Sequence, residues 1–172
     1  MPKPLLLVDV DGVLNVFGFG IEGYPSGAIN PAPEFEKVFA AQGYTISFPL
    51  GLTGRMAKLN EAFECVWATI WEDQANKLIA PELGVGYEWP VIKFQGWGRQ
   101  YTWKLPDVRE WCEENARGRR VAWVDDDLHS DAEEWAEERD RAGEPTVLVS
   151  TNYQKGLTDR LTLELLEWAI NG

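Results

Sequence analysis

The sequence is poor in positive charge and has no long apolar run. Its 172 residues contain 16 Lys and Arg against 28 Asp and Glu, which gives a formal net charge of −12. Non-specific binding along a nucleic-acid backbone requires clustered basic side chains, so this balance argues against it. A small phosphorylated ligand bound through a metal ion remains compatible with it. No stretch approaches the length of a membrane span, and we expect neither a membrane segment nor a signal peptide.

Cysteine and histidine are also scarce. Cys65 and Cys112 lack metal-binding spacing and lie in apolar sequence, so we expect reduced, buried thiols and a cytoplasmic location. His129 is the only histidine, and we expect it to be exposed near the start of a helix. Tryptophan, in contrast, is abundant: most of the nine residues should lie in the core or in pocket walls.

Strand and helix patterns alternate along the chain. Residues 4–10 form an uninterrupted apolar run, which is typical of a strand buried on both faces of a parallel sheet. This alternation predicts an α/β fold, a three-layer sandwich with a central parallel sheet and right-handed crossovers. The further strands are expected at 64–69, 90–94, 120–124 and 145–149, and the helices at 52–63, 72–79, 104–116, 130–141 and 158–170.

We expect one domain, residues 1–172, with a small flap or cap insert at about 15–52. The Gly-rich and aromatic residues 15–27 suit an irregular loop or a short hairpin. Tyr44–Leu50 alternates and is rich in strand-forming residues, so it is expected to pair with part of that loop as a flap. Residues 32–42 favour a helical turn, and Thr53 is the expected N-cap of the helix that follows.

The first strand ends in Asp9-Val10-Asp11-Gly12. Two carboxylates that converge on one point repel each other, and a hard cation such as Mg²⁺ with oxygen ligands relieves that repulsion. An ordinary Asx-type turn is the alternative, because Asp and Gly are common in turns. The motif alone leaves both interpretations open.

Other polar residues are expected at the same edge of the sheet. Thr69 and the pair Asp125 and Asp126 follow apolar strands, and Lys104 begins a helix. Taken singly, Thr69 could be a helix N-cap, Lys104 a surface lysine and the acidic run a capping turn. Taken together, they form a set of metal ligands and phosphate donors where open α/β sheets bind ligands.

The order of these motifs resembles that of the haloacid dehalogenase-like (HAD) superfamily of phosphohydrolases. The resemblance spans residues 5 to about 127. A response-regulator receiver domain fits poorly, because here the acidic pair follows the Thr and the Lys in the chain. A dehalogenase also fits poorly, because Asp11 points to phosphate chemistry. The motifs read Leu-Val-Asp9-Val-Asp11-Gly-Val-Leu, Trp-Ala-Thr69, Lys104 and Trp-Val-Asp125-Asp126.

The resemblance implies a Mg²⁺-dependent phosphatase with an aspartyl-phosphate intermediate. Asp9 would be the nucleophile, and Asp11 would protonate the leaving oxygen and later activate water. Thr69 and Lys104 would bind the phosphoryl oxygens. The ion would be held by Asp9, the backbone carbonyl of Asp11 and Asp125, with Asp126 supporting it through water or from outside the ligand set.

Aromatic residues crowd the loops where a substrate would lie, and aromatic rings stack on nucleobases. We therefore expect a phosphorylated small molecule or nucleotide as substrate, with Trp97 and Arg99 among its contacts. A polynucleotide end, a phosphoprotein or a non-catalytic phosphate-binding module are the alternatives, and the oligomeric state is not indicated. Asp131 is assigned to a helix surface. The aromatic residues concerned are Phe17, Phe19, Tyr24, Trp97, Tyr101 and Trp103.

Overall fold

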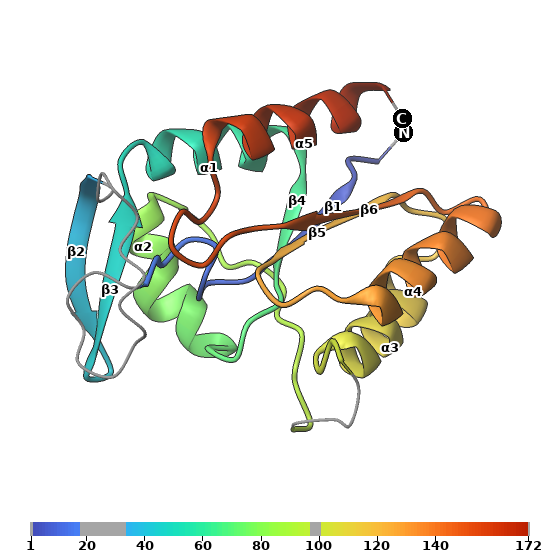
Figure 1. Ribbon diagram of the computed structural model, residues 1–172, viewed down its shortest axis with the longest axis horizontal. Helices are drawn as coiled ribbons and strands as arrows, with labels where there is room; N and C mark the ends of the chain where they lie inside the picture. The colour runs from blue at the N-terminus through green and yellow to red at the C-terminus, as the bar shows by residue number, and fades with distance from the viewer. Residues whose placement is uncertain (1, 18–33, 97–100, 172) are drawn as a thin grey trace.

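The computed structural model describes residues 2–17, 34–96 and 101–171. A four-stranded parallel sheet lies at its centre, in the order β4-β1-β5-β6. Helices α1 and α5 cover one face of this sheet, and α3 and α4 cover the other (Figure 1). The predicted α/β fold with a central parallel sheet is therefore confirmed. The elements are β1 (Leu5–Val8), β4 (Glu64–Trp67), β5 (Val121–Asp125), β6 (Thr146–Ser150), α1 (Leu52–Ala62), α3 (Leu105–Asn115), α4 (Ser130–Arg141) and α5 (Asp159–Asn171).

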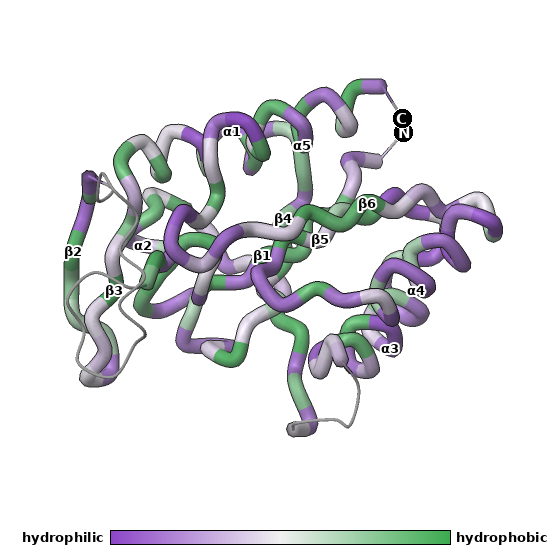
Figure 2. Tube along the Cα trace, in the orientation of Figure 1, coloured by the Kyte–Doolittle hydropathy of each residue, from purple (hydrophilic) through white to green (hydrophobic). Residues whose placement is uncertain are grey.

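The apolar run of β1 fills the core on both faces of the sheet. Leu6 and Val8 pack into one cluster with α1 and α5, whereas Leu5 and Leu7 pack into a second cluster with α3 and α4. Successive strand residues point to opposite faces, so only a strand that is apolar at every position can serve both clusters. The outer helices show the complementary pattern, since α5 alternates between hydrophobic and hydrophilic stretches (Figure 2).

The buried residues agree with the sequence in two further respects. Cys65 and Cys112 are free and buried. Four of the tryptophans lie almost completely inside the core, and Trp71, Trp111 and Trp168 are half-buried against it, so most of the nine do pack on the core as predicted. The four core tryptophans are Trp67, Trp89, Trp123 and Trp135.

None of the helices in the described ranges is long and apolar enough to cross a membrane.

The strand order places a reversal beside β1. After β1 the chain adds β4 on one side, and it then crosses to the other side of β1 for β5 and β6. Open α/β sheets bind ligands outside the carboxyl ends of their strands, at the point where the order reverses. The ends of β1 and β5 are therefore the expected place for a site.

A hairpin, β2 (Phe35–Ala41) and β3 (Tyr44–Pro49), is inserted between β1 and α1. Its turn residues Gln42 and Gly43 have φ angles of 49° and 83°. This left-handed geometry suits a two-residue hairpin turn, because its twist matches that of the paired strands. The hairpin lies at the end of the molecule away from α3 and α4 (Figure 1).

The hairpin corrects one prediction and bears out part of another. The expected helical turn at 32–42 is wrong, because residues 35–41 form an extended strand once the turn at 42–43 folds them onto β3. Tyr44–Leu50 does form a strand, and its partner along the hairpin is β2. Most of the loop at 15–27 lies outside the described residues. Val16, near its start, does contact β3, since its N–H donates to the Ser47 carbonyl at 3.0 Å.

The prediction that Thr53 caps α1 is also wrong. Gly51 holds the N-cap position with a φ of 80° and has no side chain that could cap the helix, and the Thr53 N–H in the first turn donates to the Glu36 carboxylate at 3.1 Å. The Thr53 hydroxyl instead donates to the Glu36 carboxylate on β2. This bond ties the start of α1 to the hairpin.

The segment between β4 and α3 is less regular than predicted. In place of one helix over 72–79 it contains a π-helix, η1 (Ala75–Ile79), and then α2 (Ala80–Leu83). Pro81 does not stop the helix, because it lies in the first turn of α2, where no N–H is required. Gly84 does end it, with a φ of 78°. Residues 90–94 form no strand and contribute one isolated bridge, from Val91 to Trp67.

Candidate functional site

The two inner strands of the sheet bring carboxylates to one edge. Asp9 follows β1, Asp125 ends β5, and Asp126 comes next. One oxygen from each of these three side chains lies within 4.8 Å of the others. Val8 and Val124 are paired in the parallel register, so the strand ends cannot separate unless the sheet opens. We call Asp9, Asp125 and Asp126 the carboxylate group.

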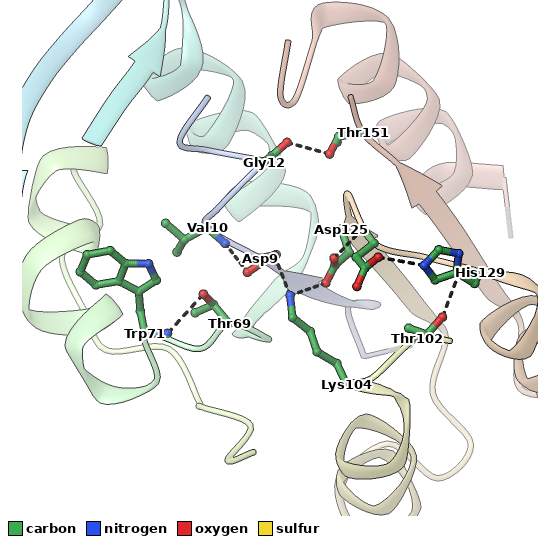
Figure 3. A network of polar contacts seen from close by, with 11 residues as sticks. Asp9, Val10, Gly12, Thr69, Trp71, Thr102, Lys104, Asp125, His129 and Thr151 are labelled. Carbon is green, nitrogen blue, oxygen red and sulfur yellow. Dashed lines mark hydrogen bonds and ion pairs between the residues drawn. The ribbon is translucent and has the colours of Figure 1, made fainter. Parts of the chain in front are cut away.

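The ammonium group of Lys104 lies between two of these carboxylates. Its Nζ is 2.6 Å from Asp9 Oδ2 and 2.7 Å from Asp125 Oδ2 (Figure 3). Lys104 is the N-cap residue of α3 and is only 5% exposed. Burial lowers the pKa of its side chain, but Asp9 and Asp125 outweigh this effect and raise the pKa of Lys104. The lysine is therefore a fixed cation of the site.

One ammonium does not balance the negative charge here. Burial raises the pKa of Asp9 to about 8; Lys104 opposes this shift, and Asp125 adds to it. Desolvation and Asp125 raise the pKa of Asp126 to about 6. Three carboxylate oxygens directed at one point form the donor set that Mg²⁺ prefers, and the excess negative charge favours a divalent cation. These residues therefore fit the expected ion.

The turn after β1 is held by the loop after β6. Gly12 has a φ of 76°, a left-handed conformation that glycine adopts easily because it has no Cβ atom. Its carbonyl accepts a hydrogen bond from the Thr151 hydroxyl at 2.8 Å (Figure 3). The Thr151 N–H in turn donates to the Asp125 carbonyl at 3.0 Å. These bonds fix the ends of β1 and β5 relative to each other.

Thr69 lies on the other side of Asp9. It follows β4, and the Ala68 N–H before it donates to the Val8 carbonyl at 2.9 Å, which extends the β4–β1 pairing to the tip. Thr69 is completely buried, and its hydroxyl oxygen accepts the Trp71 N–H at 3.4 Å. It begins a turn and no helix, so the helix-cap alternative is wrong. A buried hydroxyl beside Asp9 is suited to donate a hydrogen bond to a phosphoryl oxygen.

The Asp11 side chain is not part of the carboxylate group and has hydrogen-bond partners of its own. Its Oδ2 accepts the indole N–H of Trp71 at 2.9 Å, and its Oδ1 accepts the Asn15 amide at 2.9 Å. Among the described residues, the side-chain oxygens placed for an ion are those of the carboxylate group. This placement leaves the Asp11 backbone carbonyl as the atom expected to contribute to the ion, and keeps the Asp11 carboxylate outside the ligand set.

Neither Trp71 nor Asn15 was identified from the sequence. Asn15 comes four residues after Asp11, a spacing that no short motif marks. Trp71 is sixty residues from Asp11 along the chain, and only the pairing of β4 with β1 brings it close. The one sequence signal that could have pointed to Trp71 as a site residue is its position two residues after Thr69.

The residues expected to contact a substrate are described only in part. Trp97 and Arg99, as well as Phe19 and Tyr24, lie outside the described residues. Tyr101 is 79% exposed, and the half-buried Trp103 ring has its centroid 5.7 Å from Lys104 Nζ. An aromatic surface therefore does border the site next to the buried lysine.

Asp131 is not the simple surface residue that was expected. Its carboxylate accepts the Thr102 hydroxyl at 2.6 Å and the Thr102 N–H at 3.0 Å. The Thr102 hydroxyl oxygen also accepts the His129 N–H at 2.9 Å (Figure 3). His129 itself is exposed at the N-cap of α4, as predicted. This network fastens the start of α4 to the segment that carries Lys104.

The assembled groups are three acids at the strand ends that could hold a cation, a buried ammonium, a buried hydroxyl and a separate carboxylate held by two donors. Such a set can stabilise the transfer of a negatively charged group to Asp9. Comparisons with family models, with curated proteins and with solved structures gave no match, so the resemblance to the HAD superfamily rests on the sequence motifs alone.

Proposed function

We propose that this chain is a Mg²⁺-dependent phosphomonoesterase of the HAD type that acts through an aspartyl-phosphate intermediate on nucleotide-like substrates. The observation that carries the proposal is the position of Lys104 Nζ, 2.6 Å from Asp9 and 2.7 Å from Asp125, at the edge of the carboxylate group. This arrangement supplies a nucleophile, positive charge for a phosphoryl group and ligands for a cation at one point.

In the first half of the reaction an Asp9 oxygen attacks the phosphorus. The bond from phosphorus to the ester oxygen breaks, and the leaving oxygen takes a proton from Asp11. Lys104 and the Thr69 hydroxyl bind the phosphoryl oxygens. In the second half water attacks the phosphorus and gives a proton to Asp11. The bond to Asp9 then breaks, which releases inorganic phosphate and restores both carboxyl groups.

The metal requirement follows from charge. Asp9, Asp125 and Asp126, with the carbonyl of Asp11, would hold the ion. Bound Mg²⁺ supplies positive charge between the Asp9 carboxylate and the phosphate dianion, which otherwise repel each other. Without a cation, burial keeps the pKa of Asp9 high and disfavours the ionised nucleophile.

A nucleotide-like substrate is supported by the aromatic residues next to the site. Trp103 borders Lys104, the exposed Tyr101 ring faces that of His129, and Tyr44 packs against Trp71 near Asp11. A planar base can stack on such rings. The net charge of −12 favours a mononucleotide over a long polyphosphate chain.

The direct test is hydrolysis of p-nitrophenyl phosphate with Mg²⁺, with EDTA and by the variant Asp9→Asn. We expect turnover that EDTA abolishes, no turnover by Asp9→Asn, and normal turnover by the control Asp73→Asn, which alters an exposed acid. During turnover the unaltered protein should carry a hydroxylamine-labile phosphate on Asp9. Robust hydrolysis by Asp9→Asn would reject the nucleophile assignment.

A substrate panel then separates the remaining alternatives. Nucleoside monophosphates, oligonucleotides phosphorylated at the 3′ or 5′ end and phosphopeptides should be compared by kcat/KM. We expect the mononucleotides to be preferred. Preference for an oligonucleotide or a phosphopeptide would show that the substrate is a polynucleotide end or a phosphoprotein. Tight nucleotide binding without turnover would indicate a non-catalytic binding module.

A further inference from the structure

The Asp11 carboxylate has a hydrogen-bond donor on each oxygen. Trp71 Nε1 donates to Oδ2 and Asn15 Nδ2 donates to Oδ1, both at 2.9 Å. The two donors come from different parts of the chain, the turn after β4 and the loop after β1. Two donors on opposite oxygens restrict rotation of the carboxylate more than either donor alone.

Asn15 is itself held in one orientation. It is only 2% exposed, and its Oδ1 accepts the Ser47 N–H of β3 at 2.8 Å. If the amide flipped, its oxygen would face the Asp11 carboxylate and its NH₂ group would face the Ser47 N–H. Both contacts would then be repulsive, so the amide orientation is determined by its partners. Through Asn15, the hairpin is connected directly to Asp11.

Trp71 is held by Thr69, in the turn after β4, and by Tyr44 of the hairpin. Its backbone N–H donates to the Thr69 hydroxyl oxygen at 3.4 Å (Figure 3). Its ring packs edge to face against Tyr44 at the start of β3, with ring centroids 6.0 Å apart. The next residue, Glu72, adopts a φ of 44°, an uncommon conformation for a residue with a side chain. The turn that directs the Trp71 indole toward Asp11 therefore depends on this uncommon backbone conformation at Glu72.

We infer that Trp71 and Asn15 are positioning residues that hold the Asp11 carboxyl group in place for proton transfer to the leaving oxygen. This inference rests on the proposed function, in which Asp11 gives that proton as the ester bond breaks and regains one from water. It also assigns a role to the β2–β3 hairpin, which orients Asn15 through Ser47 and contacts Trp71 through Tyr44. Orientation of a general acid decides how much of its catalytic effect is realised.

Substituted aryl phosphates provide the test, because they share a ring but differ in the pKa of the leaving phenol. p-Nitrophenolate departs readily without a proton, whereas phenolate and p-methoxyphenolate require protonation. Trp71→Phe keeps an aromatic ring against Tyr44 and removes the N–H donor. The matched control is Trp111→Phe in α3, a half-buried tryptophan that packs on the second core cluster.

We expect Trp71→Phe to lower kcat/KM for phenyl and p-methoxyphenyl phosphate by about 10- to 100-fold, part of the contribution of a general acid, and to change kcat/KM for p-nitrophenyl phosphate by less than about threefold. The ratio kcat/KM is compared because it reports the step in which the phenol leaves, whereas kcat also contains the later attack of water, which is the same for every substrate. Asn15→Ala should give the same dependence on the leaving group, and Trp111→Phe should match the unaltered protein. Thermal unfolding and circular dichroism verify that each variant is folded.

Two results would overturn the inference. If Trp71→Phe lowers kcat/KM for all aryl phosphates equally, or for none of them, the indole N–H has no role in proton transfer to the leaving oxygen, although the phosphatase assignment stands. If the unaltered protein hydrolyses no aryl phosphate with Mg²⁺, both the proposed function and this inference fail. The two failures are therefore distinguishable in one set of assays.

Discussion

A Cβ atom on Gly12 would lie 2.3 Å from the Cγ atom of Asp126. Real carbon atoms never approach so closely without a bond, so the position must be glycine for the Asp126 carboxylate to stand where it does. The turn after β1 and the tip of β5 thus fit together only because one of them has no side chain. This contact adds a steric requirement to the conformational one at Gly12.

Gly12→Ala should weaken Mg²⁺ binding by about 10- to 100-fold, as displacement of a supporting group at a metal site does. Gly84→Ala is the matched control, because Gly84 has a φ of 78° and nothing within 4 Å of the added Cβ. Both variants carry backbone strain of about 1–3 kcal/mol. Isothermal titration with Mg²⁺ separates the strain, which both variants share, from the clash with Asp126, which only Gly12→Ala creates. Equal Mg²⁺ affinities in the two variants would contradict the role given to the Gly12–Asp126 contact.

Lys104→Met should destabilise the metal-free protein by about 3–5 kcal/mol, because it leaves two buried carboxylates without their cation. The exposed Lys93, which pairs with Asp73 at 2.5 Å, supplies the control: Lys93→Met should cost less than about 1 kcal/mol. Urea unfolding with and without Mg²⁺ measures both. Mg²⁺ should recover part of the loss in Lys104→Met, and a variant as stable as the unaltered protein without Mg²⁺ would refute the ion-pair argument.

Thr69→Val should lower kcat for p-nitrophenyl phosphate by about 10²–10³, the effect of removing one donor to a developing charge. The substitution nearly preserves shape, so the melting temperature should change little. Thr162→Val is the control, since the buried Thr162 hydroxyl of α5 donates to the carbonyl of Thr158, the residue before the helix, away from the site. Unchanged kcat in Thr69→Val would remove this residue from the proposed mechanism.

Asp131→Asn should lower the melting temperature at neutral pH by about 3–12 °C, because hydrogen bonds to a charged group contribute about 1.5–3 kcal/mol. Although desolvation opposes it, hydrogen bonding from Thr102 holds the pKa of Asp131 below its usual 3.8. The charged group therefore stabilises the fold above pH 3.8, and this contribution is lost as the pH falls through the lower native pKa. Melting curves from pH 7 to strongly acidic solution should show the difference between the variant and the unaltered protein shrinking.

The control is Glu133→Gln, an exposed acid in the same turn of α4. It should change the melting temperature little at any pH. A destabilisation of Asp131→Asn that stays constant across the titration would show that its carboxylate charge is not involved.

The sheet and the strand-end acids were predictable because their signals are local. The apolar run before Asp9 and the run before Asp125 each define a strand and place the acid at its end, and parallel pairing then brings the two ends together. The second strand of the hairpin, β3, was predicted, but β2 was missed because the charged residues Glu34, Glu36 and Lys37 obscure its strand alternation. The turn at Gln42-Gly43, which folds β2 onto β3, has a backbone geometry that the sequence pattern did not reveal.

The donors to Asp11 could not be predicted for a different reason. The contact from Trp71 joins residues sixty positions apart, and it depends on how the turn after β4 is shaped. The role of Asn15 depends on its simultaneous contact with the N–H of Ser47, thirty-two positions away. Such arrangements are properties of the packed structure and leave no periodic trace in the sequence.

In the described sheet, β1 and β5 each have a hydrogen-bonded neighbour on both sides, and they are neighbours of each other. Fraying at either edge of the sheet, at β4 or at β6, therefore leaves β1 and β5, which carry Asp9 and Asp125, hydrogen-bonded to each other. Amide protons of these two strands should exchange with solvent only through global opening. A ligand that joins the two tips would then raise the stability of the entire fold, and the protein would lose its site and its native state in a single cooperative event.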